Sequence, residues 1–345
     1  MKLNSESSIK KSFKKISLSC LKVKCNIVKY PFAMNRFFKL FMVCLFVSNC
    51  ESQTNRKPKN DFKIQNSISA PTYSSRSAIP YNLSTPNKKY HLPAILEEIS
   101  GLTDIDSAHV ACVQDEIGMV FIYNFLIDSI VVRHKFDSVG DFEGLTFTGK
   151  SLFVLRSDGR LTEWENFSPK TGSGKVLHTM LPLQTTNNEG LCFDSKKNRL
   201  LIAAKSKPIN HDYKSERFIY EFDLNQKKLN KSPAYSINTI ELEAAAKEFK
   251  IVQQNRTESG KLRPFNFRPA SLAVHPQTSD IYIISAADKL LLVINEQGEI
   301  RNMERLNDDL FAKAEGITFL SDGTMIITNE AAGKVPTLLI FKPTN

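Results

Sequence analysis

The sequence lacks several features on which common protein functions depend. Its six cysteines include no pair separated by two residues, which argues against a zinc site. The apolar run Leu40–Val47 has eight residues, too few to cross a bilayer of roughly 30 Å as a helix. The sequence also contains no Gly-x-Ser-x-Gly nucleophile turn, no His-Glu-x-x-His zinc motif and no phosphate-binding glycine loop. These absences leave no recognisable catalytic motif.

The sequence also gives no sign of a strongly basic folded domain, although the chain carries a formal net charge of +10. Residues 1–63 contain 14 Lys and Arg against three acidic residues, so the remainder of the chain is close to neutral. A nucleic-acid-binding fold would carry its basic stripe on the folded part. We therefore expect no nucleic acid among the partners.

The segment from Met34 to Cys50 has the layout of a bacterial secretory signal. A short basic stretch is followed by the apolar run Leu40–Val47 and a small polar stretch that ends in cysteine. This ending, Val-Ser-Asn-Cys, resembles the lipobox of bacterial lipoproteins, in which the cysteine is lipidated and becomes the new N-terminus. Asn49 departs from the Gly or Ala that is usual before the cysteine. A plain secretory signal or a short uncleaved anchor is the alternative.

This resemblance implies a leader over residues 1–49, with the signal peptide proper at 34–49. We expect translation to begin at Met34, because signal peptides start close to the initiator. A lipid on Cys50 would anchor the protein to the plasma or outer membrane of the cell envelope. Residues 51–87 are rich in Ser, Asn, Lys and Pro, so we expect residues 50–87 to form a flexible tether.

A short phrase recurs five times in the rest of the chain and opens each of five repeats. Its central residues are Gly101, Gly144, Gly190, Ser271 and Gly316, which are separated by 43, 46, 81 and 45 residues. The regular spacing matches the roughly 40–50 residues of a four-stranded propeller blade. Strand-like runs punctuated by Asp, Gly, Asn and Ser follow each phrase. The pattern predicts an all-β fold, a five-bladed β-propeller over residues 88–345.

The interval of 81 residues is long enough for one blade and an insertion. Residues Ile240–Phe249 favour a helix by propensity, and Asn238 with Glu241 suits a capping box. A helical insertion is the simplest account, and a sixth, degenerate blade is the alternative.

The last repeat ends after three strands and needs a fourth from elsewhere. Lys88–Leu92 resembles the strand-like run Lys175–Pro182 that precedes the third phrase. We therefore expect Lys88–Leu92 to complete the last blade, which closes the ring and removes its open edges.

The repeated phrases resemble those of the SdiA-regulated (YjiK-like) family and, more distantly, NHL-repeat propellers. The resemblance rests on Glu98–Leu102, Asp141–Thr146, Glu189–Leu191 and Ala314–Phe319, and it covers about residues 88–345. It implies a five-bladed, envelope-associated propeller with a calcium ion in a shared site, and it assigns no biochemical activity.

The residue before each central Gly or Ser should approach the channel of the propeller. These positions hold Ser100, Glu143, Glu189, Ala270 and Glu315. Three carboxylates that converge on a narrow channel repel one another unless a cation or protons compensate them. Carboxylate and carbonyl oxygens suit Ca²⁺. The candidate metal ligands are Glu143, Glu189 and Glu315, assisted by Glu98, Asp141, Asn188 and Glu330. Alternatively, the repeated Glu residues bond backbone amides of neighbouring blades and bind no ion.

Three functions fit these observations. The favoured one is a non-enzymatic envelope lipoprotein whose calcium-binding propeller binds an unknown small molecule or protein. The second is a calcium-dependent hydrolase, because lactonase, esterase and phosphatase propellers resembling it hold an ion in a similar channel; only His211 and Asp212 are candidate bases. The third is a metal-free scaffold. Fold alone does not choose among them.

Overall fold

The computed structural model describes residues 67–68, 78–251, 259–261 and 265–344. These residues belong to a compact unit of residues 61–345, which is separate from a unit of residues 1–60. The predicted leader, the lipidation site Cys50 and most of the tether lie outside the described residues. Within the described ranges, no helix is long and apolar enough to cross a membrane.

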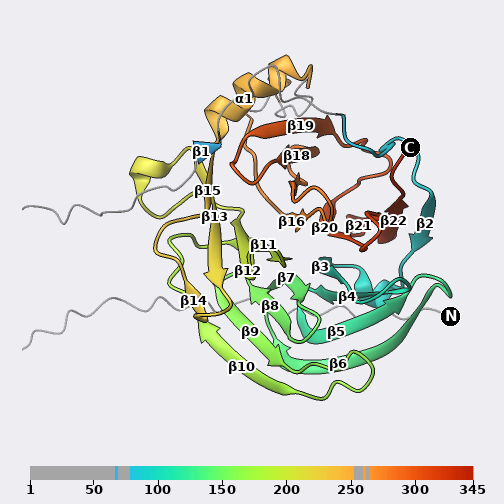
Figure 1. Ribbon diagram of the computed structural model, residues 1–345. Coiled ribbons are helices and arrows are strands. Elements are labelled where there is room, and N and C mark those ends of the chain that lie inside the picture. Colours follow the sequence, from blue (N-terminus) through green and yellow to red (C-terminus); the bar gives the residue numbers. More distant parts are fainter. Residues whose placement is uncertain (1–66, 69–77, 252–258, 262–264, 345) are drawn as a thin grey trace, which may run out of the picture. The chain divides into compact units, whose positions relative to one another are not determined.

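Five antiparallel sheets surround a channel, and each sheet is one blade of a propeller (Figure 1). The first blade comprises β3 (Ile99–Asp104), β4 (His109–Gln114), β5 (Ile117–Asn124) and β6 (Ser129–Val139). The second comprises β7 (Phe142–Phe147), β8 (Leu152–Arg156), β9 (Arg160–Glu165) and β10 (Lys175–Met180). The third comprises β11 (Asn188–Asp194), β12 (Arg199–Ala204), β13 (Glu216–Asp223), the short β14 (Lys228–Leu229) and β15 (Tyr235–Asn238).

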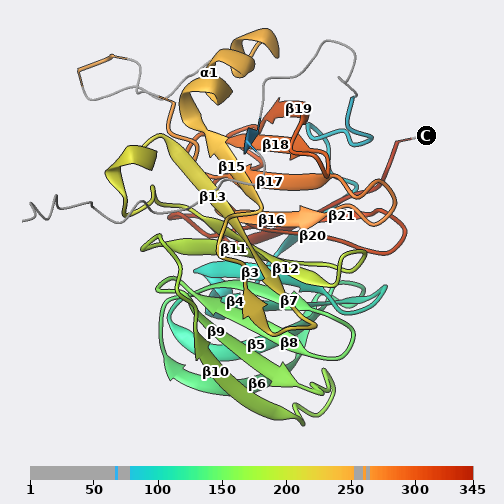
Figure 2. The ribbon, with the colours of Figure 1, turned by 60° about the vertical axis from the view of Figure 1, so that its left-hand side comes forward.

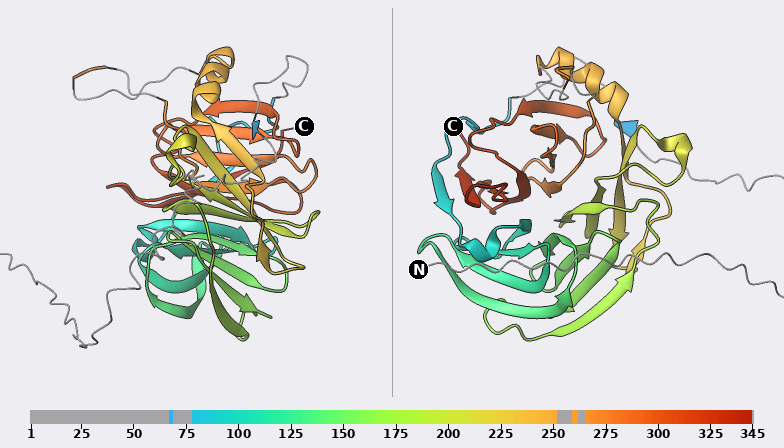
Figure 3. Two further views of the ribbon diagram at one scale, coloured as in Figure 1. Left: turned by 90° about the vertical axis from the view of Figure 1, so that its left-hand side faces the viewer. Right: turned by 180° about the vertical axis from the view of Figure 1, so that it is seen from behind.

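The fourth and fifth blades complete the ring, which Figure 3 also shows from behind. The fourth comprises β16 (Ser271–Val274), β17 (Ile281–Ser285), β18 (Leu290–Ile294) and β19 (Ile300–Arg305). The fifth comprises β20 (Ala314–Phe319), β21 (Met325–Asn329), β22 (Thr337–Phe341) and, from the other end of the domain, β2 (Lys88–His91). The pairing of β2 with β22 confirms that Lys88–Leu92 supplies the missing outer strand. The five-bladed fold is thereby confirmed and the sixth blade is excluded.

The innermost strands of the five blades approach one another very closely. Each of β3, β7, β11, β16 and β20 contacts the inner strand of both neighbouring blades. A Cβ atom on Gly144 would lie 2.6 Å from the carbonyl oxygen of Glu189, and one on Gly101 would lie 2.6 Å from the backbone nitrogen of Leu145. Gly101 and Gly144 are therefore needed for backbone-to-backbone packing around the channel.

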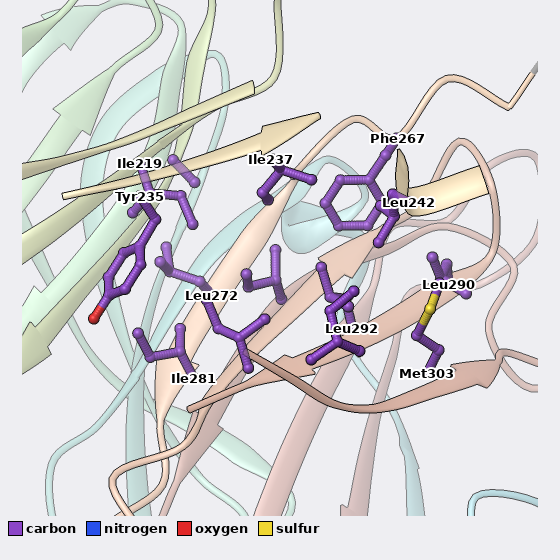
Figure 4. Close-up of a cluster of buried hydrophobic side chains, with 14 of the residues drawn as sticks. Ile219, Tyr235, Ile237, Leu242, Phe267, Leu272, Ile281, Leu290, Leu292 and Met303 are labelled. Carbon is purple, nitrogen blue, oxygen red and sulfur yellow. The ribbon is translucent and has the colours of Figure 1, made fainter. Parts of the chain in front are cut away.

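Five apolar clusters hold the blades together, one between each neighbouring pair. Figure 4 shows the cluster between the third and fourth blades, where Ile219 and Tyr235 face Leu272 and Leu292. Middle strands such as β12, β17 and β21 are buried on both faces, which explains their continuous apolar runs. Cys112 lies in one of these clusters as a buried free thiol.

The predicted helical insertion is present as α1 (Thr239–Glu248), at the outer edge of the third and fourth blades (Figure 2). The side-chain oxygen of Asn238 accepts hydrogen bonds from the backbone nitrogens of Ile240 and Glu241, which caps the helix as expected. Leu242 of α1 packs on the same apolar cluster as Phe267 (Figure 4).

Residues 78–87, the end of the predicted tether, lie against the propeller. The Tyr81 hydroxyl donates a 2.6 Å hydrogen bond to the carbonyl oxygen of Gly323 and lies 2.9 Å from Nε2 of His275. Further upstream, β1 (Ser67–Ile68) pairs in parallel with β15. The packed chain therefore begins before residue 88.

We expect Gly144→Ala to destabilise the propeller by about 1–3 kcal/mol, because its Cβ would overlap the next inner strand. The matched control is Ser271→Ala, since Ser271 stands at the equivalent position of the fourth blade and already carries a Cβ atom. Urea unfolding of both variants measures the effect. Equal midpoints for Gly144→Ala and the wild type would show that the inner strands separate easily.

Candidate functional site

Three glutamates reach one mouth of the channel through the same backbone irregularity. Glu143, Glu189 and Glu315 each lie at a shift of register between the inner strand and its neighbour. Such a β-bulge leaves one residue unpaired and re-aims its side chain. The fourth blade pairs regularly from Ser271 onward and has Ala270 at the equivalent position. The predicted convergence of the three carboxylates is thus built by three bulges.

A lysine that the sequence analysis did not identify lies among these carboxylates. The ammonium group of Lys205 lies 2.6 Å from Oε2 of Glu189. The pKa of Lys205 is raised because attraction to Glu315, Glu189 and Glu143 outweighs the effect of burial. Lys205 directly follows β12, whose last residue, Ala204, pairs with the first residue of β11. Its side chain therefore supplies a positive charge where the prediction placed a metal ion.

Hydrogen bonds fix the positions of two of the carboxylates. The Ser100 hydroxyl donates to Oε2 of Glu143 at 3.0 Å and to the Glu143 carbonyl oxygen at 3.1 Å. The side-chain amide of Asn187 donates to Oε1 of Glu189 at 3.1 Å. The side chains of Ser100, Asn187 and Lys205 therefore hold these carboxylates, whereas the alternative prediction expected backbone amides to hold them.

Burial and mutual repulsion keep part of this group protonated near neutral pH. Burial, followed by the charge of Asp141, raises the pKa of Glu143 to about 7. Burial, followed by the charge of Glu143, raises the pKa of Glu189 to about 8, although Lys205 acts in the opposite direction. These raised pKa values favour protonation of Glu143 and Glu189, which lessens the repulsion among the carboxylates.

A second set of acidic residues surrounds the first. The ammonium group of Lys313 forms an ion pair with Glu330 and lies 3.6 Å from Oε1 of Glu315. Burial, and then the charge of Glu330, raises the pKa of Glu98. Burial, and then the charges of Glu98 and Glu330, raises the pKa of Asp115 to about 6. Asp115 was not among the predicted residues, because it lies in a turn between β4 and β5.

Two other predicted ligands have structural partners. Asn188 is fully buried, and its amide nitrogen donates to the Ser157 carbonyl oxygen at 2.9 Å while its oxygen accepts from the Thr185 hydroxyl at 2.5 Å. Asp141 is exposed and accepts a short hydrogen bond from the Ser157 hydroxyl. The structure thus brings Glu143, Glu189 and Glu315 together, connects Glu98 and Glu330 to them through Lys313, and uses Asn188 for packing.

The residues present do not fit a calcium ion in this arrangement. Ca²⁺ takes six to eight oxygen ligands, whereas the oxygen of Glu189 that faces the group contacts an ammonium group instead. No cluster of three or more carboxylate, histidine or cysteine side chains in the described ranges has a metal-holding geometry. Calcium remains a prediction, and binding would require Lys205 to move.

The candidate bases of the hydrolase hypothesis lie in a different kind of environment. His211 and Asp212 are exposed, in a short 3₁₀ helix between β12 and β13. The side chain of Asn210 accepts a hydrogen bond from the backbone nitrogen of Asp212 and caps this helix.

We expect the pH dependence of stability to report the buried carboxylates. A carboxyl group whose pKa is raised on folding stabilises the native state below its unfolded pKa of about 4.5, and this stabilisation is lost as the pH rises through its folded pKa. The free energy of unfolding should therefore decrease between about pH 5 and pH 8, by about 1.4 kcal/mol per unit of pKa shift at most. Glu189→Gln should flatten this decrease.

Urea unfolding at several pH values measures this effect. The control is Glu243→Gln, which removes an exposed carboxylate from α1 and should follow the wild-type profile. A Glu189→Gln profile parallel to that of the wild type would mean that Glu189 is ionised throughout this range.

Comparison with known proteins places the chain in one family. The model of the SdiA-regulated family matches residues 75–336. A solved structure of Myxococcus xanthus glutaminyl cyclase is similar, with 12% identity, a TM-score of 0.47, and coverage of 75% of this chain and 95% of that one. Streptogramin B lyase is also similar, with 13% identity, a TM-score of 0.43, and coverage of 73% and 97%. Curated proteins gave no match. The match over most of its length shows that the chain belongs to the SdiA-regulated family.

Proposed function

We propose that the protein is a non-enzymatic binding module of the cell envelope, tethered through a lipid on Cys50. Its acidic channel mouth binds a positively charged small molecule or protein segment. The supporting observation is the excess of acidic over basic side chains at this mouth. The acidic residues near one another are Glu98, Asp115, Asp141, Glu143, Glu189, Glu315 and Glu330, and the lysines facing them are Lys205 and Lys313.

The raised pKa values support this proposal. Burial raises the pKa of Asp115 to about 6 and that of Glu143 to about 7, and the charges of acidic neighbours raise both further. A cationic ligand at this mouth would relieve that repulsion and lower both pKa values. Binding would then release protons, and the attraction would weaken with added salt.

Calcium is the inorganic cation that this mouth would take. Glu143, Glu189 and Glu315 would hold it with help from Glu98 and Glu330, and it would supply a fixed positive charge for an anionic group of a ligand. The ammonium group of Lys205 would first have to leave Glu189.

We expect a fluorescent oligolysine peptide to bind the propeller at low salt. Glu98→Gln combined with Asp115→Asn should weaken binding at least about tenfold, because two charges at the mouth are lost. The matched control is Glu241→Gln combined with Glu243→Gln, which removes two exposed charges from α1. Fluorescence anisotropy measures the affinity. Equal weakening in both double variants would refute a specific mouth.

Thermal unfolding with calcium and then with excess chelator tests the metal. A calcium-dependent rise of the midpoint in the wild type that is lost in Glu143→Gln would establish a bound ion through linkage. No change at millimolar calcium would refute the calcium site and leave the organic cation as the ligand.

A hydrolase is the second candidate, and one observation favours it. Carboxyl groups with pKa values of about 7 and 8, as in Glu143 and Glu189, are suited to donating or accepting protons at neutral pH. Screening of lactone, ester and phosphoester substrates tests this, with Glu143→Gln and Glu189→Gln as the inactive variants. Turnover that persists in both variants would exclude these residues as its cause.

A further inference from the structure

The opposite mouth of the channel contains a cavity of about 280 Å³. All five inner strands contribute to its wall, which includes Asp104, Phe147, Phe193, Val274 and Phe319. These residues stand four positions after the carboxylate positions of the repeated phrase, so the two mouths are about 13 Å apart along the strands. The cavity is therefore separate from the site already described.

Asp104 is the only acidic or basic side chain among the residues that line this cavity. Its Oδ1 accepts a 3.0 Å hydrogen bond from the Thr318 hydroxyl, whose oxygen in turn accepts from the Asp104 backbone nitrogen at 3.2 Å. Burial raises the pKa of Asp104, opposed only by these hydrogen bonds, and no charged neighbour contributes. Within the described ranges, no basic side chain forms an ion pair with it.

Other buried carboxylates of the same ring are compensated by the chain itself. Asp194, at the end of β11, lies 2.8 Å from Nε of Arg199. Glu189, at the far mouth, contacts Lys205. An ionised carboxylate in a cavity without a basic partner is costly, and a cation that enters the cavity would remove that cost.

Aromatic rings supply the second half of a cation site. Phe147, Phe193 and Phe319 line the same cavity as Asp104. Phe319 is fixed by edge contacts with His275 and Tyr282, whose ring centroids lie 4.9 and 5.0 Å away. Aromatic faces attract organic ammonium groups, and desolvation strengthens that attraction.

The chemistry of the wall distinguishes an organic cation from a metal ion. Ca²⁺ takes at least six oxygen ligands, whereas the side chains of this cavity offer one carboxylate and the hydroxyls of Thr103, Thr146, Thr148, Ser195, Thr318 and Ser321. Three of these hydroxyls are already used, because Thr318 donates to Asp104, Thr103 accepts from the Phe147 backbone nitrogen at 3.1 Å, and Thr148 donates to the Ser151 carbonyl oxygen at 3.1 Å. The cavity volume is close to the lower limit for small-molecule sites.

We propose that this cavity is a second binding site, which takes a small organic ammonium compound paired with Asp104 and enclosed by Phe147, Phe193 and Phe319. The exposed residues Ser195, Pro276 and Ser321 form its rim and give access from solvent. The site is independent of the acidic mouth and does not require the function proposed for it.

Calorimetric titration of residues 61–345 with choline tests this site, with 3,3-dimethylbutanol as the neutral analogue of the same shape. We expect choline to bind at least about tenfold more tightly than the alcohol, because only choline pairs with a carboxylate. Asp104→Asn should abolish this preference, and Phe193→Leu should weaken choline binding severalfold. Asp104→Asn removes a partly buried charge that has no basic partner in the described ranges, so unfolding should show an equal or higher stability.

Binding at the acidic mouth must be distinguished from binding at Asp104. Glu98→Gln combined with Asp115→Asn should leave choline affinity unchanged. Loss of choline binding in that double variant with retention in Asp104→Asn would overturn the proposal. Equal affinities for choline and the alcohol, or no saturable choline binding to the wild type, would also overturn it.

Discussion

The close approach of the five inner strands is the constraint on which the rest of the structure depends. At Gly144 and Gly101 the neighbouring backbone occupies the place of a Cβ atom, so the blades meet at their inner edges without intervening side chains. The narrow channel that results forces the residues beside these glycines together. Glu143 and Glu189 are therefore neighbours because of a packing requirement, and their repulsion is a consequence that other residues must offset.

Lys205 and bound protons provide this compensation in the arrangement described. An ammonium group on the chain is always present at the channel, whereas a metal ion depends on its concentration in the surroundings. The nearby carboxylates raise the pKa of Lys205 and so stabilise its charged form. Burial raises the pKa values of Glu143 and Glu189 toward neutrality and so favours their protonated forms. Glu143 and Glu189 can therefore exchange protons near neutral pH when an external charge approaches.

The sequence predicted the features that depend on spacing and local propensity. Five phrases at blade spacing predicted five blades, Lys88–Leu92 was correctly assigned to the last blade, and Asn238 correctly marked the start of α1. Lys205 and Asp104 were not identified. Lys205 acts through carboxylates on other strands, and Asp104 stands out because no basic side chain in the described ranges pairs with it. Neither residue belongs to the repeated phrase.

The bulges explain why the ligand set was only partly predictable. Strand alternation assigns a side chain to one face, but a bulge at Glu143 or Glu315 changes that assignment locally. Asn188 precedes the bulge of its own strand and is directed into the packing between blades, although it is adjacent to Glu189 in sequence. Two adjacent residues at the bulge therefore have different surroundings: the Glu189 carboxylate faces the channel, and the Asn188 amide is buried between blades.

The two mouths of the channel are formed by the same strands but differ in their chemistry. At the first mouth, bulges bring several carboxylates together, so the chain must supply cations of its own. At the second mouth the strands pair regularly, and their side chains are apolar or hydroxylic apart from Asp104. A single carboxylate in aromatic surroundings selects for shape as well as charge, whereas a dense acidic group selects mainly for charge. The repeated phrase determines the five-bladed ring, and the positions where the sequence departs from the repeat determine which side chains lie at each mouth of the channel.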